Sequence, residues 1–72
     1  MSISISDLIT IVRKGGGINI DATKITVSDL IVIARKANGS GATIYIRNAA
    51  ALSSDDLKVI ASKAGGKVIF EI

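Results

Sequence analysis

Hydrophobic and polar residues follow one pattern that occurs three times along the chain. Each occurrence has a hydroxyl residue, an aspartate three positions later, a leucine directly after the aspartate, and further apolar residues at helical spacing. A hydroxyl residue followed three positions later by an acid is typical of a helix start, because these side chains satisfy the first free N–H groups. The pattern predicts helices over residues 4–14, 26–37 and 53–64.

The predicted helix starts share a second feature, an apolar residue just before the hydroxyl. In that position it can pack on the leucine one turn into the helix, as a hydrophobic staple. All three starts are in register, so we expect the same helix start three times. The capping pairs are Ser4/Asp7, Thr26/Asp29 and Ser53/Asp56, and the staple pairs are Ile3/Leu8, Ile25/Leu30 and Leu52/Leu57.

The segments between the predicted helices alternate apolar and polar residues, as half-buried strands do. They are Ile18–Asp21, Ala42–Arg47 and Lys67–Ile72. Strands covered on both faces would instead be apolar throughout. We therefore predict a two-layer α/β fold with a parallel three-stranded sheet and all helices on one face. The core is expected to contain Leu8, Ile11, Ile18, Ile20, Leu30, Ile33, Ile44, Ile46, Leu57, Ile60, Val68 and Phe70.

Charge and helix flanks favour the strand order 1-2-3. Short connections favour right-handed crossovers between neighbouring parallel strands. On the open face this order sets Arg47 between Asp21 and Glu71, and opposite charges across strands stabilise a sheet. Only the second helix is apolar on both flanks, whereas each outer helix has one polar flank, as terminal units of a repeat protein need. These polar flanks are Ser6/Thr10 and Ser54/Lys58.

The chain resembles the leucine-rich-repeat solenoid in the length and layout of its units. Its capping aspartates are 22 and 27 residues apart, within the range of stacked supersecondary units. The family consensus L-x-x-L-x-L-x-x-N is absent, but Asn48 and Asp21 stand where its turn asparagine follows a strand. The helical motif D-L-x-x-I-[AV]-x-K is also similar to that of short bacterial proteins. The resemblance implies one domain, 1–72, a short solenoid with repeats at about 3–24, 25–51 and 52–72, that serves protein binding or assembly.

Composition removes several classes of function. The 72 residues include no histidine and no cysteine, which are the usual general base, thiolate nucleophile and soft metal ligands. We therefore predict no enzyme, no metal site and no cofactor. The longest apolar run, Leu30–Ala34, is too short to cross a bilayer, and the first residues lack the pattern of a secretory signal. We expect a cytoplasmic protein without a membrane partner.

Glycine-rich clusters follow each predicted helix and precede each predicted strand. They are Gly15–Gly17, Asn38–Gly41 and Gly65–Gly66. A phosphate-binding loop has the reverse order, because it follows a strand and opens a helix whose N-terminus faces the anion. We interpret these clusters as left-handed exits from the helices rather than as nucleotide sites.

Lysine and arginine residues end each predicted helix. We call these residues the basic rim: Arg13, Lys14, Arg35, Lys36 and Lys63. With a net charge of +3, the chain offers an anionic partner a complementary surface. No aromatic residue is interleaved for base stacking, which disfavours nucleic acid. Cations that complement the negative end of a helix dipole explain the basic rim without a partner.

The open face of the predicted sheet carries the one polar constellation of interest, Asp21, Tyr45 and Arg47. Tyrosine and arginine are enriched in binding hot spots, so these residues can be read as a small binding epitope. They can equally be read as a solvated face with ordinary cross-strand pairs. The sequence leaves both interpretations open.

The outer strands favour self-association as the function. Neither contains proline, and proteins normally avoid such exposed edges unless the edge is used. Antiparallel pairing of the third strand with its own copy, with Ile69 on the two-fold axis, sets Lys67 against Glu71 twice. Parallel stacking of the third strand on the first of another copy would oppose Glu71 and Asp21. We predict a homodimer or larger assembly; the alternative is an adaptor for another protein or an anionic polymer, bound through the open face and the basic rim.

Overall fold

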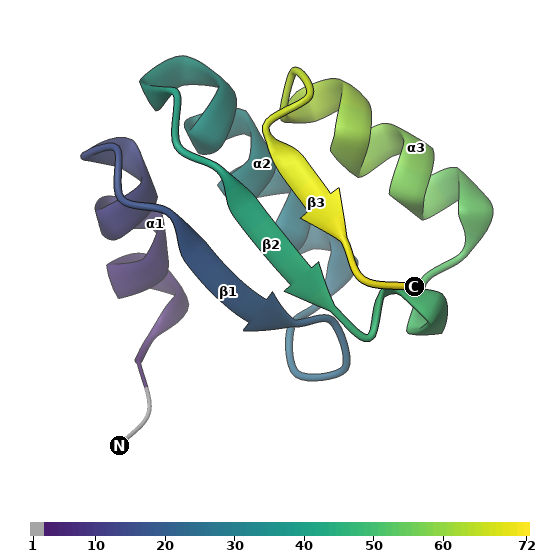
Figure 1. The fold of residues 1–72 in the computed structure, drawn as a ribbon. Helices are drawn as coiled ribbons and strands as arrows, with labels where there is room; N and C mark the ends of the chain where they lie inside the picture. The colour runs from purple at the N-terminus through teal and green to yellow at the C-terminus, as the bar shows by residue number, and fades with distance from the viewer. Residues whose placement is uncertain (1–2) are drawn as a thin grey trace.

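Three helices and three strands alternate along the chain in this computed structural model, which describes residues 3–72 (Figure 1). The fold is the expected α/β arrangement. Each strand follows a helix, so every connection from one strand to the next contains a helix. The elements are α1 (Ile5–Arg13), β1 (Ile18–Asp21), α2 (Val27–Ser40), β2 (Ile44–Arg47), the 3-10 helix η1 (Ala49–Ala51), α3 (Ser54–Lys63) and β3 (Val68–Phe70).

The three α-helices begin with the same local geometry. Ser4, Thr26 and Ser53 are the N-caps, with φ/ψ of −73°/160°, −72°/155° and −70°/158°. Each hydroxyl accepts a hydrogen bond from the N–H group three residues later, at 3.1, 3.3 and 3.1 Å. The hydroxyl half of the predicted capping is therefore confirmed, and it satisfies one of the free N–H groups at each helix start. The hydrogen bonds described for residues 3–72 include none to the side chains of the three capping aspartates.

The sheet is parallel with the order β1-β2-β3, as predicted. In its register Asp21 lies opposite Arg47, while Tyr45 lies opposite Ile69. Backbone pairing continues past β3, because the Glu71 N–H donates to the Ile46 carbonyl at 2.9 Å. The strands are shorter than predicted, since β2 begins at Ile44 and β3 ends at Phe70.

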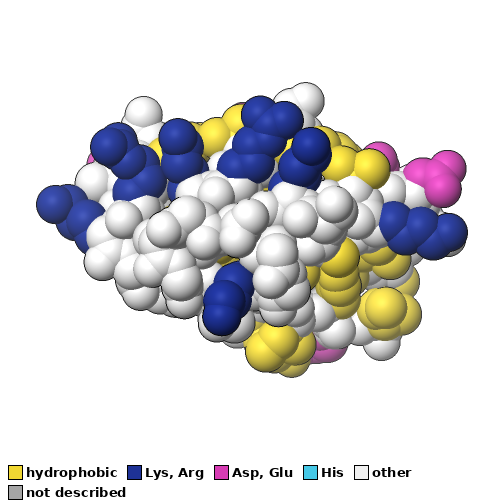
Figure 2. Space-filling model, turned by 90° about the horizontal axis from the view of Figure 1, so that it is seen from above, with side chains coloured by type: hydrophobic (Ala, Val, Ile, Leu, Met, Phe, Trp, Pro, Cys, Tyr) yellow, Lys and Arg dark blue, Asp and Glu magenta, His cyan; other side chains and the backbone are white. Residues whose placement is uncertain are grey.

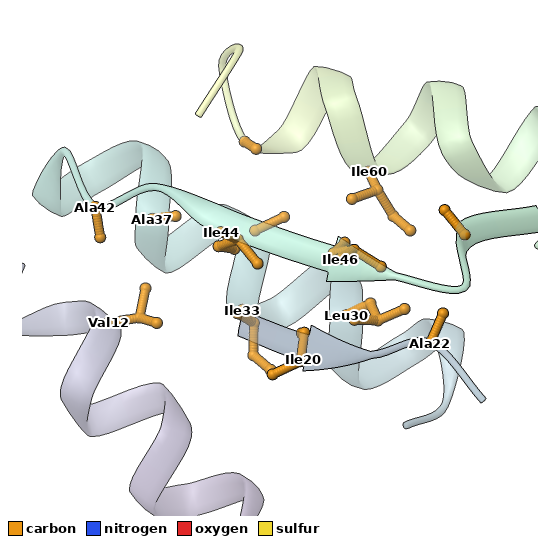
Figure 3. Close-up of a cluster of buried hydrophobic side chains, with 13 residues drawn as sticks. Val12, Ile20, Ala22, Leu30, Ile33, Ala37, Ala42, Ile44, Ile46 and Ile60 are labelled. Atoms are coloured by element: carbon orange, nitrogen blue, oxygen red, sulfur yellow. The ribbon is translucent and has the colours of Figure 1, made fainter. Parts of the chain in front are cut away.

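An aliphatic core fills the space between the sheet and the helices. Figure 1 shows α2 crossing behind the sheet, with α1 beside β1 and α3 beside β3. Leu30 and Ile33 of α2 point toward Ile44 and Ile46 of β2, and Ile60 of α3 points toward the same strand (Figure 3). These five side chains are at most 1% exposed. Burying a side chain of this size stabilises the fold by about 1.5–3 kcal/mol.

The packing of α1 differs from the prediction. Ile11 was expected in the core but is 38% exposed, whereas Val12 is fully buried. The equivalent residues of the other helices, Ile33 and Ile60, are fully buried. The cause is topological: α2 and α3 each connect two strands and pack beneath both, whereas α1 precedes β1 and has a strand on one side only.

Helix α2 is longer than predicted. It continues through Asn38 and Gly39 to Ser40, and the left-handed residue is Gly41, with φ 78°. The Gly41 N–H donates to the Ala37 carbonyl at 2.8 Å. The Ser40 hydroxyl donates to the Val12 carbonyl and so joins the ends of α2 and α1. Consequently no cation lies in the last turn of α2.

Two further local features depart from the sequence prediction. Asn48, with φ 57°, turns the chain directly after β2 and begins η1, which was not predicted. Of the three residues expected to form staples, Ile25 and Leu52 pack partly buried against the core. Ile3 is 52% exposed, because it precedes α1 at the outer end of the helix layer.

Candidate interaction surfaces

The end of β1 is held by a cluster of polar side chains around Asp21. One carboxylate oxygen of Asp21 accepts hydrogen bonds from the Thr23 N–H at 2.9 Å, the Thr23 hydroxyl at 2.7 Å and the Asn48 side chain at 3.0 Å. The hydrogen bond from Asn48, followed by those from Thr23, lowers the pKa of Asp21 from 3.8 to about 2. Asp21 therefore ties the turn after β1 to the turn after β2.

Arg47 and Glu71 make different contacts from those predicted. The strand register does place Arg47 opposite Asp21. However, the Arg47 Nε donates to the Asn19 side chain at 2.7 Å, and Glu71 accepts from the Tyr45 hydroxyl at 3.1 Å. The proximity of Arg47 is only the smallest cause of the lowered pKa of Asp21. The Glu71 carboxylate raises the pKa of Tyr45 above its ordinary value, both as acceptor and as a nearby charge.

The open sheet face is thus covered by hydrogen bonds between its own side chains. The three predicted residues Asp21, Tyr45 and Arg47 lie on this face but do not contact one another through the hydrogen bonds described. Sequence reasoning missed the partners Asn19, Thr23 and Asn48. Asp21 and Thr23 form an Asx-type turn whose spacing is readable in the sequence. Arg47 bonds to Asn19 rather than to Asp21, which lies opposite it in the register. This depends on how far the Arg47 side chain extends along the neighbouring strand.

The outer edge of β3 offers backbone groups and exposed apolar side chains. The Lys67 carbonyl accepts from Ile44 and the Glu71 N–H donates to Ile46, so the odd residues of β3 bond to β2. Because backbone groups alternate in direction along a strand, those of Val68 and Phe70 point away from the sheet. Ile69 is 52% exposed on the open face. Lys67, Ile69 and Glu71 therefore lie side by side along this edge, as the sequence predicted.

Arg13, Lys14 and Lys63 of the basic rim lie where α1 and α3 finish, whereas Arg35 and Lys36 lie in the middle of the longer helix α2. All five residues of the basic rim are exposed. Figure 2 shows lysine and arginine side chains in a row across the molecule, with acidic side chains only at its margins. A depression of about 310 Å³ beside α1 is lined by Thr10, Arg13 and Lys14.

The described part of the chain contains neither a metal-binding cluster nor a membrane-spanning helix. Within residues 3–72, no group of three or more acidic residues is close enough to hold a metal ion. None of the helices described there is long and apolar enough to span a membrane. No protein-family model matches the chain, and neither a curated protein nor a solved structure shows significant similarity to it.

Proposed function

We propose that this protein is a non-enzymatic assembly module that forms a homodimer through the free edge of β3. One observation carries the proposal: this edge combines outward backbone groups with a self-complementary row of side chains, Lys67, Ile69 and Glu71. The function would be structural, because the module would join two copies into one six-stranded sheet.

The direction of the backbone groups supports an axis at Ile69. In antiparallel pairs, hydrogen-bonded and non-hydrogen-bonded residue pairs alternate. With Ile69 opposite its own copy, Val68 would face Phe70 of the second copy, and both present outward N–H and C=O groups. The Ile69 pair would be of the non-hydrogen-bonded kind, which suits a residue whose own backbone groups bond to β2. The same register keeps the helices of both copies on one side of the sheet.

The side chains along the edge also fit this register. Lys67 would face Glu71 of the second copy twice, and each such cross-strand pair stabilises by about 0.2–1 kcal/mol. Tyr45 occupies only the Oε2 atom of Glu71, so Oε1 stays available to a lysine. On the covered face Val68, Phe70 and Leu57 are only half-buried, and a neighbouring strand would cover more of their apolar surface.

Two competing modes of action are less well supported. Parallel stacking of β3 on β1 of another copy would oppose Glu71 and Asp21. An adaptor that used the open sheet face would find the Tyr45 hydroxyl and the Arg47 Nε already bonded to Glu71 and Asn19. The β3 homodimer leaves all of these contacts in place.

We further propose that the three helix–strand units are repeats of one short solenoid. Their identical helix caps support this, as does the strand register, which sets Ile18 opposite Ile44 and Ile44 opposite Val68. In this view the polar outer flanks of α1 and α3 limit the array to three units within a chain, since terminal repeats need a polar surface. The edge of β3 then joins one array to another.

Sedimentation velocity on an Ile69→Lys variant tests the dimer. Two lysines would meet on the two-fold axis, so we expect the parent to sediment as a dimer and the variant as a monomer. Thr43→Lys is the matched control, because it adds the same charge at an exposed residue directly before the central strand, away from β3. The proposal is wrong if Ile69→Lys sediments like the parent, or if both variants dissociate alike.

A further inference from the structure

The charges of this protein are separated between the two ends of the fold. Helix C-termini and strand N-termini share one end, and helix N-termini and strand C-termini share the other (Figure 1). All six acidic residues lie at the second end: Asp7, Asp29, Asp55 and Asp56 in the first turns of helices, and Asp21 and Glu71 where strands finish. Arg13, Lys14, Lys63 and Lys67 lie at the first end, and Arg35 and Lys36 lie in the middle of α2. The positive charges are therefore concentrated away from the acidic end, although the net charge is only +3.

Helix-dipole complementarity does not account for these positive charges. Arg35 and Lys36 lie before the last turn of α2, beyond the range over which the dipole effect acts. Each helix C-terminus carries about half a negative charge, so three helices offset only about 1.5 of the five positive charges of the basic rim. None of the side-chain hydrogen bonds among residues 3–72 uses a rim cation, so these charges are free to meet a ligand.

We infer that the basic rim binds the phosphate backbone of a duplex nucleic acid, without reading its sequence. Neighbouring packed helices are 8–10 Å apart, so cations on three helices form a row about 20 Å long. B-DNA carries one charge per about 1.7 Å of its axis with both strands counted, so a stretch of about 20 Å carries about twelve phosphates, of which about half face the row. Each rim cation can therefore meet a phosphate, and the depression beside Arg13 and Lys14 leaves room for one.

The shape of the basic rim favours a nucleic acid over a lipid surface. Helices that bind membranes lie flat, with an apolar face turned to the lipid. Here the view from above shows lysine and arginine side chains in a row across the molecule (Figure 2), and rim cations come from all three helices. The two aromatic residues, Tyr45 and Phe70, belong to strands rather than to the basic rim, so contacts would be to phosphates and not to stacked bases.

Fluorescence anisotropy with a labelled 20-base-pair DNA duplex of mixed sequence tests the inference. Binding should weaken steeply with salt, because five phosphate contacts give a slope of about −4.5 in log K against log salt concentration. The variant K14Q/K36Q/K63Q should bind at least about tenfold more weakly, with the slope reduced to about −2. A second duplex of unrelated sequence should bind equally well.

The matched control is K24Q/R47Q/K58Q, which removes the same net charge away from the basic rim. Lys67 is left unchanged in both variants because it belongs to the proposed dimer interface, so the two proposals are tested separately. Thermal unfolding by circular dichroism verifies that both variants fold. Equal weakening by the two triple variants would overturn the inference, as would a strong preference for one duplex sequence. Binding to phosphatidylserine vesicles without binding to either duplex would also overturn it.

Discussion

The central unit of this fold, α2 with β2, is buried far more completely than the outer units. Ile33 is fully buried, whereas Ile11 at the equivalent place in α1 is 38% exposed. Likewise Ile44 and Ile46 of β2 are at most 1% exposed, whereas the β3 residues paired with them are half-buried. The three units have nearly the same sequence pattern, so the difference comes from their neighbours: only the central unit is packed on both sides.

Because of this difference, the stability of the fold and the proposed dimer depend on different parts of the molecule. The central unit supplies most of the buried aliphatic surface and should dominate the free energy of unfolding. The outer units carry half-buried apolar side chains, free strand edges and the polar cluster around Asp21. The proposed dimer depends on these outer units.

The largest expected effect is on the central unit. Leu30 is 1% exposed in the core, so Leu30→Ala should lower the free energy of unfolding by about 2–5 kcal/mol. For a domain of this size each 1 kcal/mol shifts the Tm by about 4–8 °C, so a loss of at least about 10 °C is expected. Chemical denaturation and calorimetry measure both quantities. If the free energy of unfolding fell by less than about 1 kcal/mol, the neighbouring side chains would have to fill the cavity that the substitution leaves.

The equivalent isoleucines provide the sharpest test of the comparison between units. Ile33→Ala should cost about 2–5 kcal/mol, and Ile11→Ala about 1 kcal/mol or less, because much of the Ile11 side chain is already in water. The two substitutions remove the same atoms from equivalent positions of α1 and α2, so each controls for the other. Equal losses in urea unfolding would contradict the difference in burial between α1 and α2.

The smallest expected effect concerns the polar cluster of the β1 unit. The pKa of Asp21 is about 2 in the folded protein, lowered from 3.8. A lowered folded-state pKa contributes stability that is present above the unfolded pKa and is lost as the pH falls toward the folded one. The free energy of unfolding should therefore fall as the pH is lowered from about 4 to about 2. In Asp21→Asn the free energy of unfolding should depend less on pH over this range. Urea unfolding measured at intervals across this range is the test, with Asp55→Asn as an exposed control.

Local signals in the sequence were sufficient for much of the fold. Capping pairs such as Ser53/Asp56 indicated the helix starts, and the alternation in Ile44–Arg47 indicated a sheet covered on one face. Both signals depend on residues a few positions apart. The strand order also followed, because short connections leave few topologies.

The features that were not predicted depend on contacts between distant residues. Exposure of Ile11 follows from the missing strand beyond β1, which its own sequence cannot show. The end of α2 was misplaced because either Gly39 or Gly41 could end the helix. The helix ends directly before Gly41, and the hydrogen bond from Ser40 to the distant Val12 carbonyl holds this last turn in place. On the candidate surfaces, the residues along β3 were correctly placed by alternation, whereas the partner of Arg47 was not.

An engineered disulfide tests the proposed β3 homodimer most directly. The chain has no cysteine, so Ile69→Cys introduces a single thiol. On the two-fold axis the two Cα atoms would be about 4.5 Å apart, within the range that a disulfide spans. We expect mild oxidation to convert Ile69→Cys into a covalent dimer rapidly and almost completely. Thr43→Cys, directly before the central strand, should remain largely monomeric on non-reducing electrophoresis. Cross-linking of Ile69→Cys no faster than that of Thr43→Cys would contradict the β3 interface.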